Sequence, residues 1–262
     1  MKKIFFLAMT ALVMLACNNE PGAMNGVFSV SKSQKVYFSQ GNLQYQASTN
    51  TWRFAANQYD ILGEQNCNVS DKYDGWIDTF GWGTGKNPTA TSSNSADYSK
   101  FSDWGNNAIS NGGNETYLWR TLSHTEWKYL LEQRRNAAEL CGLATVNGVQ
   151  GCVLLPDNWK SSSKFSFAAD WHNYDHNVYS ASEWKKMEAR GAVFLPAGGW
   201  RFGKEMTRVN EYGGYWTSTG TDNNSDDPQA FGFYFDGDDD GIYNNYTFPR
   251  RFCMTVRLVQ DK

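Results

Sequence analysis

Two short segments of the chain carry apolar residues at helical spacing, and each begins with a capping box. In such a box a serine lies three residues before a glutamate. The side chain of each residue accepts a hydrogen bond from the backbone amide of the other at the start of a helix. The boxes pair Ser123 with Glu126 and Ser180 with Glu183. Trp127 and Trp184 follow the glutamates and begin the apolar stripes. The pattern predicts helices over 124–138 and 181–190.

Runs of alternating apolar and polar residues predict strands on both sides of these helices. Asn147-Gly148, between two such runs, is the signature of a type I′ hairpin turn. Two helices framing a twisted, mostly antiparallel sheet form an α+β architecture. The expected strands cover 27–30, 35–39, 43–46, 52–54, 215–218, 230–235, 242–248 and 253–259.

Residues 60–114 are rich in Gly, Asn, Ser and Asp, with Trp76, Trp82 and Trp104 as isolated aromatic residues. Aromatic residues make up 16% of the chain, and disordered chains lack such content. We therefore expect long ordered loops held by aromatic packing. No proline-rich linker follows the N-terminal segment, so we expect a single domain over 26–262.

The first 17 residues have the layout of a bacterial lipoprotein signal. Lys2 and Lys3 precede an apolar run over 4–15, which is shorter than the ~20 residues of a bilayer span. We expect cleavage before Cys17, acylation of that cysteine and a short tether over 18–25. The protein would then be lipid-anchored at the outer membrane or cell surface, with periplasmic or external orientation left open. An ordinary secretory signal is the alternative.

Charge and cysteine content narrow the functional classes. The net charge is −3 and 19% of residues are charged, which argues against nucleic-acid binding. Apart from Cys17 the chain has Cys67, Cys141, Cys152 and Cys253, and an exported chain with an even number permits disulfides in three connectivities. Cys141 and Cys152 flank the expected hairpin and are the first candidates for a pair. Unpaired buried cysteines are the alternative.

Three motifs follow one another along the chain. They are Trp119-Arg120-Thr121-Leu122-Ser123-His124-Thr125-Glu126-Trp127-Lys128-Tyr129, Gly214-Tyr215-Trp216-Thr217-Ser218-Thr219 and Thr255-Val256-Arg257-Leu258-Val259. Together they resemble the formylglycine-generating-enzyme branch of C-type-lectin-like domains. Such domains occur in Bacteroidetes-type surface lipoproteins and in the variable proteins of diversity-generating retroelements. The resemblance spans roughly 119–259 and implies a C-type-lectin-like fold.

The resemblance also offers an enzymatic alternative, a formylglycine-generating-type oxidoreductase. Such enzymes use two closely spaced cysteines near the C-terminal end of the domain, whereas this chain offers only Cys253 there. We therefore expect no enzymatic activity and no cofactor. Arg120 and Arg257 lie inside the motifs beside apolar residues. We interpret them as structural arginines, bonded to carbonyls or paired with a carboxylate such as Glu126.

Residues 217–249 have an unusual composition. Of these 33 residues, 24 are Asn, Asp, Ser, Thr, Tyr or Gly, and none is Lys, Arg, Glu, Trp or Met. Adenine-targeted retroelement mutagenesis of Asn-type codons yields this set, and so does ordinary drift of surface loops. Tyrosines among small polar residues also resemble a paratope. We expect a ligand-binding surface built from Thr221, Asn223, Tyr234, Asp236, Asp238, Tyr243, Asn245 and Tyr246.

The acidic turn in this region spaces carboxylates at Asp236, Asp238 and Asp240, as in a calcium loop. The twelfth position is Thr247 rather than a bidentate glutamate, so calcium is the weaker interpretation and a solvated hairpin tip the stronger. The sequence thus predicts a non-catalytic, lipid-anchored module that binds a protein or glycan on another cell or surface. A structural surface subunit that binds its own kind is a further alternative.

Overall fold

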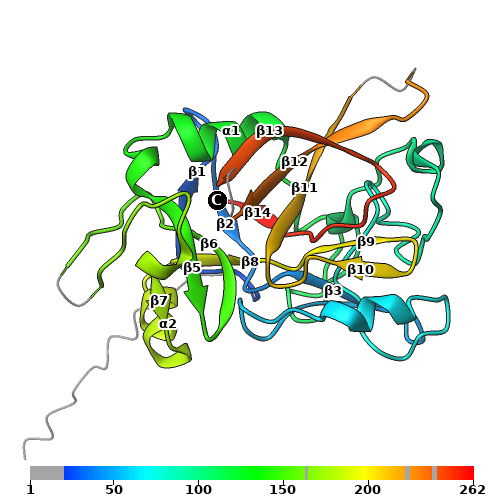
Figure 1. Cartoon of the computed structure of the whole chain (residues 1–262), viewed down its shortest axis with the longest axis horizontal. Helices are drawn as coiled ribbons and strands as arrows, with labels where there is room; N and C mark the ends of the chain where they lie inside the picture. The colour runs from blue at the N-terminus through cyan, green and yellow to red at the C-terminus, as the bar shows by residue number, and fades with distance from the viewer. Residues whose placement is uncertain (1–20, 163–164, 222–224, 238–240) are drawn as a thin grey trace, which may run out of the picture.

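The computed structural model describes residues 21–162, 165–221, 225–237 and 241–262. Strands make up 34% of the structure and helices 16%, so the molecule is β-rich and built from several small sheets (Figure 1). The expected α+β lectin fold, with two helices framing one sheet, is therefore wrong. The physical reason is that the helices are too short to form a layer, while loops and strand pairs enclose most of the core.

Five small sheets contain the strands of the described residues. Their orders are β1-β2-β14, β3-β4, β7-β5-β6-β8, β9-β10 and β11-β12-β13, and every pairing is antiparallel except that of β5 with β7. The strands are β1 (Phe28–Ser29), β2 (Lys35–Phe38), β3 (Leu43–Gln46), β4 (Thr51–Phe54), β5 (Cys141–Val146), β6 (Val149–Leu154), β7 (Val178–Tyr179), β8 (Val193–Pro196), β9 (Trp200–Phe202), β10 (Glu205–Thr207), β11 (Tyr212–Gly220), β12 (Gln229–Asp236), β13 (Ile242–Pro249) and β14 (Val259–Asp261).

Helical segments are short. Both predicted capping boxes are confirmed, at the N-termini of α1 and α2. The α-helices are α1 (His124–Lys128) and α2 (Ala181–Glu188), and η4 (Tyr129–Gln133) is a π-helical turn. The 3₁₀ turns are η1 (Gly63–Asn68), η2 (Ser95–Tyr98), η3 (Trp104–Asn106), η5 (Ala137–Glu139) and η6 (Tyr174–His176).

The helix expected over 124–138 is much shorter than predicted. After α1 the chain widens into η4, where the amide of Arg134 donates to the carbonyl of Tyr129 at 2.8 Å. The buried side chain of Arg134 donates from Nε to the Leu130 carbonyl at 2.7 Å. In a regular α-helix this carbonyl oxygen would accept from the backbone amide of Arg134, but here it accepts from the arginine side chain instead. The helix consequently ends at Arg134, whose ψ is 157°.

The Asn147-Gly148 hairpin is confirmed. Both residues have positive φ, 52° and 81°, as a type I′ turn requires, and β5 pairs with β6 from Cys141–Leu154 to Val146–Val149. Strand β6 also pairs with β8, so two similar stretches of sequence, each ending in Leu-Pro, lie side by side in antiparallel order. Both strands are fully buried where they pair, over 151–154 and 193–196.

The prediction of a strand over 253–259 is wrong, because the C-terminal strand β14 begins only at Val259. Successive residues there bridge to three different partners: Cys253 to Arg201, Met254 to Phe80 and Thr255 to Tyr215. Each pairing lasts a single residue, so no regular ladder forms before β14. Strand β14 then pairs with β2, which joins the two ends of the described chain in one sheet.

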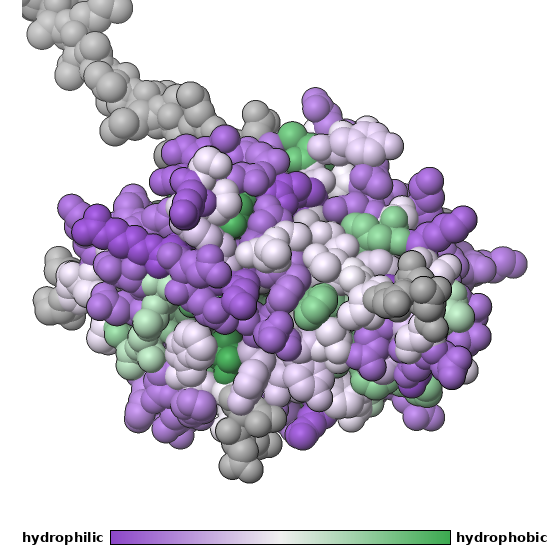
Figure 2. Space-filling view, turned by 90° about the horizontal axis from the view of Figure 1, so that it is seen from above, coloured by the Kyte–Doolittle hydropathy of each residue, from purple (hydrophilic) through white to green (hydrophobic). Residues whose placement is uncertain are grey.

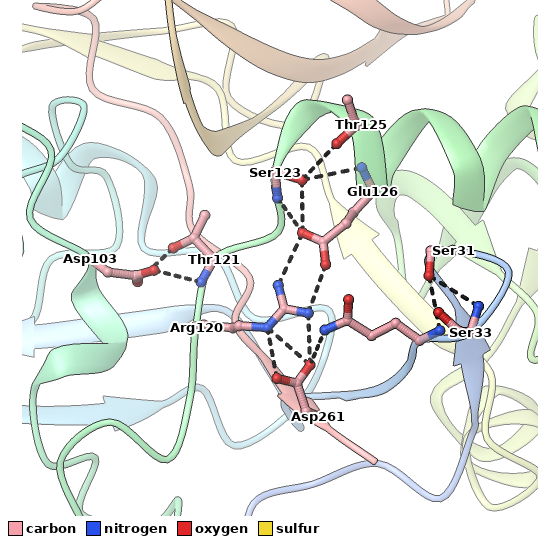
Figure 3. A network of polar contacts seen from close by, with 10 residues as sticks. Ser31, Ser33, Asp103, Arg120, Thr121, Ser123, Thr125, Glu126 and Asp261 are labelled. Atoms are coloured by element: carbon pink, nitrogen blue, oxygen red, sulfur yellow. Dashed lines mark hydrogen bonds and ion pairs between the residues drawn. The ribbon is translucent and has the colours of Figure 1, made fainter.

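Arg120 joins α1 to the C-terminal strand through a compact ionic network (Figure 3). Its guanidinium binds Glu126 at 2.7 and 3.0 Å and Asp261 at 2.7 Å. Glu126 also accepts from the Ser123 amide in the capping box, so one carboxylate serves the helix N-terminus and the arginine together. The structural role expected for Arg120 is confirmed.

Arg257 also has the structural role expected from the sequence. Its fully buried guanidinium donates to Oε1 of Gln58 at 2.7 Å and to the carbonyl of Phe194 at 3.3 Å. Burial lowers the pKa of Arg257 to about 10, so even this group stays protonated at neutral pH. Aromatic residues hold the long loop as expected: Trp104 is fully buried, and Trp82 donates to the Thr217 carbonyl at 2.9 Å.

Candidate functional site

The sheet β11-β12-β13 has two unlike faces. One face packs against α1, where Trp127 stacks on Phe233 with ring centroids 4.7 Å apart. In Figure 1, α1 lies along the top beside β13, and the β9–β10 hairpin lies to the right of β11. The other face carries aromatic side chains that run from the core to solvent. Tyr243 and Tyr246, at its outer side, are 39% and 52% exposed.

A shallow groove with a volume of about 370 Å³ opens on this second face. We call it the aromatic groove, because aromatic rings supply six of its eleven lining residues. Such a volume lies at the small end of the range of about 300–1,000 Å³ that is typical of ligand pockets. The lining residues are Trp200, Arg208, Tyr212, Gln229, Tyr234, Asp236, Tyr246, Thr247, Phe248, Pro249 and Phe252.

Rings of the groove, together with Tyr243 beside it, form one continuous row that crosses β9, β11, β12 and β13. Tyr212 of β11 stacks on Tyr234 of β12, and Tyr234 stacks on Tyr243 of β13, each with centroids 5.2 Å apart. Trp200 meets Tyr212 edge to face at 4.9 Å and lies parallel to Phe252 at 5.9 Å. Each ring is therefore held in place by its neighbours, so the surface is rigid before any ligand arrives.

Polar groups are few and lie around Tyr212. Burial raises the pKa of the Tyr212 hydroxyl, Tyr234 and Asp236 raise it further, and the guanidinium of Arg208 lowers it. The hydroxyl thus stays protonated and available as a donor, with one negative and one positive side chain within electrostatic reach. Thr247 and Gln229, which are hydrogen-bonded to each other, add a hydroxyl and an amide to the groove.

Arg208 reaches the groove from an uncommon backbone conformation. Its φ is 56°, in the left-handed region that favours Gly and Asn. The turn is held by its carbonyl, which accepts from the amides of Glu211 and Tyr212 at 3.2 and 3.0 Å.

The structure brings together part of the residue set predicted from the sequence. Tyr234, Asp236 and Tyr246 line the groove, and Tyr243 stacks on Tyr234 just outside it. Two members lie elsewhere. Asn245 interacts with the ring of His124 on α1, and Thr221 bonds to Gln229 where β12 begins.

Asn223 and Asp238 lie outside the described residues, as do Asp240 and Cys17. The calcium interpretation therefore keeps only Asp236 within the structure. Among the residues that the structure describes, no group of three or more His, Cys, Asp or Glu side chains could hold a metal ion.

Sequence reasoning missed the three lining residues of the groove that lie before residue 213. Trp200, Arg208 and Tyr212 precede the polar region and join it only because β11 pairs with β12, with Tyr212 opposite Asp236. One signal was present: Tyr212, Gly214 and Trp216 alternate with Gly213 and Tyr215. This period of two places Tyr212 on the face opposite Tyr215.

Cys253, the residue on which the enzymatic alternative depends, is fully buried. Burial raises the pKa of its thiol, and the partial compensation by Arg201 is smaller. Its Sγ contacts the carbonyl of Arg251 at 3.7 Å. A buried thiol with a raised pKa forms little thiolate at neutral pH, which is unfavourable for a nucleophile.

Comparisons with protein-family models, with curated proteins and with solved structures give no match to this chain. No helix within the described ranges has the length and apolar character needed to cross a lipid bilayer.

Figure 2 looks onto the end of the molecule that carries α1. Hydrophilic residues predominate on this face, and hydrophobic ones appear as small separate patches. Such a face is suited to contact with water.

Proposed function

We propose that the protein is a non-catalytic ligand-binding module and that the aromatic groove is its binding site. The observation that carries the proposal is the continuous row of rings from Trp200 to Tyr243, half embedded in the core and half exposed. Rigid tyrosines supply contact area at a low cost in conformational entropy, and neighbouring polar groups supply adaptable hydrogen bonds. The ligand is a protein or a glycan presented by another cell or surface.

The scaffold supports variation at the exposed end of this row. Tyr243 and Tyr246 project from β13, whereas the residues that hold the sheet, such as Phe233 and Phe235, lie on the opposite face. Substitutions at the exposed positions therefore change the binding surface with little cost to the core. This separation supports the proposal that a retroelement diversifies residues 217–249. A reverse-transcriptase gene and a near-repeat of the 3′ coding end beside this gene would test it.

The N-terminal signal supports a location for this module, a lipid anchor at Cys17 in the outer membrane, with the domain at the cell surface. A single acyl chain binds a protein to a membrane only reversibly, so stable anchoring needs at least two membrane-binding signals. The binding site would then face partners outside the cell.

The experiment that tests the binding site fills the groove. Full-length protein in detergent micelles is applied to a printed glycan array and to an array of extracellular proteins. The same arrays then receive Thr247→Trp, which places a large side chain in the groove from a partly exposed strand position. We expect ligands of the wild type to lose binding to the variant. Unchanged binding to every ligand would place the site elsewhere, for example on the loops between 74 and 104.

A further inference from the structure

Cys141 of β5 and Cys152 of β6 bring two thiols into contact inside the core. Their Sγ atoms are 3.4 Å apart, and neither residue has any exposed surface. In the hairpin register Cys141 lies opposite Leu154 and Cys152 lies opposite Leu143. The two cysteines are therefore diagonal neighbours on one face of the hairpin.

The other two thiols of the described chain have different surroundings. Cys67 is partly exposed and donates to the Glu64 carboxylate at 3.2 Å. Cys253 is buried and contacts the Arg251 carbonyl. These residues give one exposed and one buried control for any chemistry at the hairpin.

We propose that Cys141 and Cys152 form a redox site that alternates between a dithiol and a disulfide by exchange with an external disulfide. One thiolate attacks a sulfur of the external disulfide, which forms a mixed disulfide and releases one external thiol. The second cysteine then displaces the other external thiol and closes the bond between the two strands. Two electrons and two protons pass to the external pair, which leaves as two thiols.

The geometry indicates that this bond is strained and therefore reversible. Diagonal neighbours in an antiparallel pair have Cα atoms about 7–8 Å apart, whereas most disulfides need about 4.4–6.8 Å. Strained disulfides are reduced more readily than relaxed ones, so the hairpin would release the bond to a mild thiol.

Burial controls access to the site. The indole of Trp171 donates to the Cys141 carbonyl at 3.1 Å and packs against the core cluster that contains both cysteines. Burial raises the pKa of the Cys152 thiol, and the neighbouring Cys141 raises it further. Exchange in the folded protein therefore requires the hairpin to open locally.

The first test counts free thiols in the full-length protein. Samples treated with oxidised glutathione or with dithiothreitol are unfolded, alkylated and analysed by mass spectrometry with peptide mapping. We expect the oxidised sample to lose two alkylated thiols and to yield a peptide that links Cys141 to Cys152. The Cys67→Ser/Cys253→Ser variant should behave in the same way. Unchanged alkylation of Cys141 and Cys152 after oxidation, or a link to Cys67 or Cys253, would overturn the proposal.

The second test measures reversibility in the wild-type protein. Reduced glutathione is added to the oxidised wild type, and the Trp171 indole resonance is followed by NMR, assigned with Trp171→Phe. We expect a shift on oxidation that reverses with glutathione, because this indole is bonded to the Cys141 carbonyl. A link that persists in reduced glutathione would show a relaxed structural disulfide and contradict the redox role.

Discussion

Asp78 should make the stability of the fold fall as the pH rises through the weakly acidic range. The carboxyl group is fully buried, and desolvation raises its pKa from 3.8 to about 6. The groups that partly offset this effect are neutral donors. The Asn66 side chain donates at 2.8 Å and the Leu62 amide at 3.0 Å. The folded protein therefore keeps this proton up to a higher pH than the unfolded chain does.

The magnitude follows from the pKa of Asp78 in the two states. Below pH 3.8 the folded and unfolded chains both hold the proton, and the contribution of Asp78 to stability is fully present. Between pH 3.8 and about 6 the unfolded chain releases the proton first, so the free energy of unfolding falls. At 1.36 kcal/mol per pKa unit the loss amounts to about 3 kcal/mol, and it stays constant above the folded pKa.

Urea unfolding of the wild type and of Asp78→Asn at several pH values isolates the contribution of Asp78 to the free energy of unfolding. Other carboxylates titrate in both proteins and cancel in the difference. The variant loses one of the two acceptor oxygens, a cost on the order of 1–3 kcal/mol that does not vary with pH. We expect the stability difference, wild type minus variant, to fall by about 2.4 kcal/mol from pH 4 to pH 7, because the unfolded chain has already released part of this proton at pH 4. A difference that is flat over this range would refute the reasoning.

Three further predictions concern the scaffold and the anchor. Arg120→Ala leaves Glu126 and Asp261 without their shared cation, and urea unfolding should show a loss on the order of 2 kcal/mol; a loss below about 0.5 kcal/mol would contradict the network. Gly148→Ala should cost about 1 kcal/mol by the same assay, because φ is 81° while no atom lies within 4 Å of the added Cβ. Cys17→Ser should move the protein from the membrane to the soluble fraction, and a variant that stays with membranes would refute the lipid anchor.

The elements that could be predicted from the sequence are those whose determinants are local. A capping box and an Asn-Gly turn satisfy their own backbone groups within a few residues, so Ser180 with Glu183 and Asn147-Gly148 identify their elements correctly. The length of the first helix was not predictable in this way. It depends on the side chain of Arg134, which takes the Leu130 carbonyl only when the surrounding core buries it.

The candidate site, like the fold, could be predicted only in part. Tyr234 and Tyr246 belong to a hairpin whose composition marks it, and both line the groove. Trp200 and Tyr212 complete the row through β9 and β11, and no local pattern indicates that these segments meet β12. The prediction of the fold class was wrong for a related reason. Single-residue bridges such as that of Met254 to Phe80 leave no periodic pattern in the sequence.

The binding role of the aromatic groove is tested most directly by the dissociation constant of an array-identified ligand for Tyr243→Ala/Tyr246→Ala. The matched control is Tyr117→Ala, which removes a tyrosine that is 75% exposed and outside the groove. Binding is measured well below the thermal midpoint of each variant, because the double substitution also removes ring contacts with Tyr234 and Phe248. We expect the groove variant to bind at least tenfold more weakly, roughly 1.4 kcal/mol, and the control to bind as the wild type does. Equal affinities for the groove variant and the wild type would contradict the assignment of this surface.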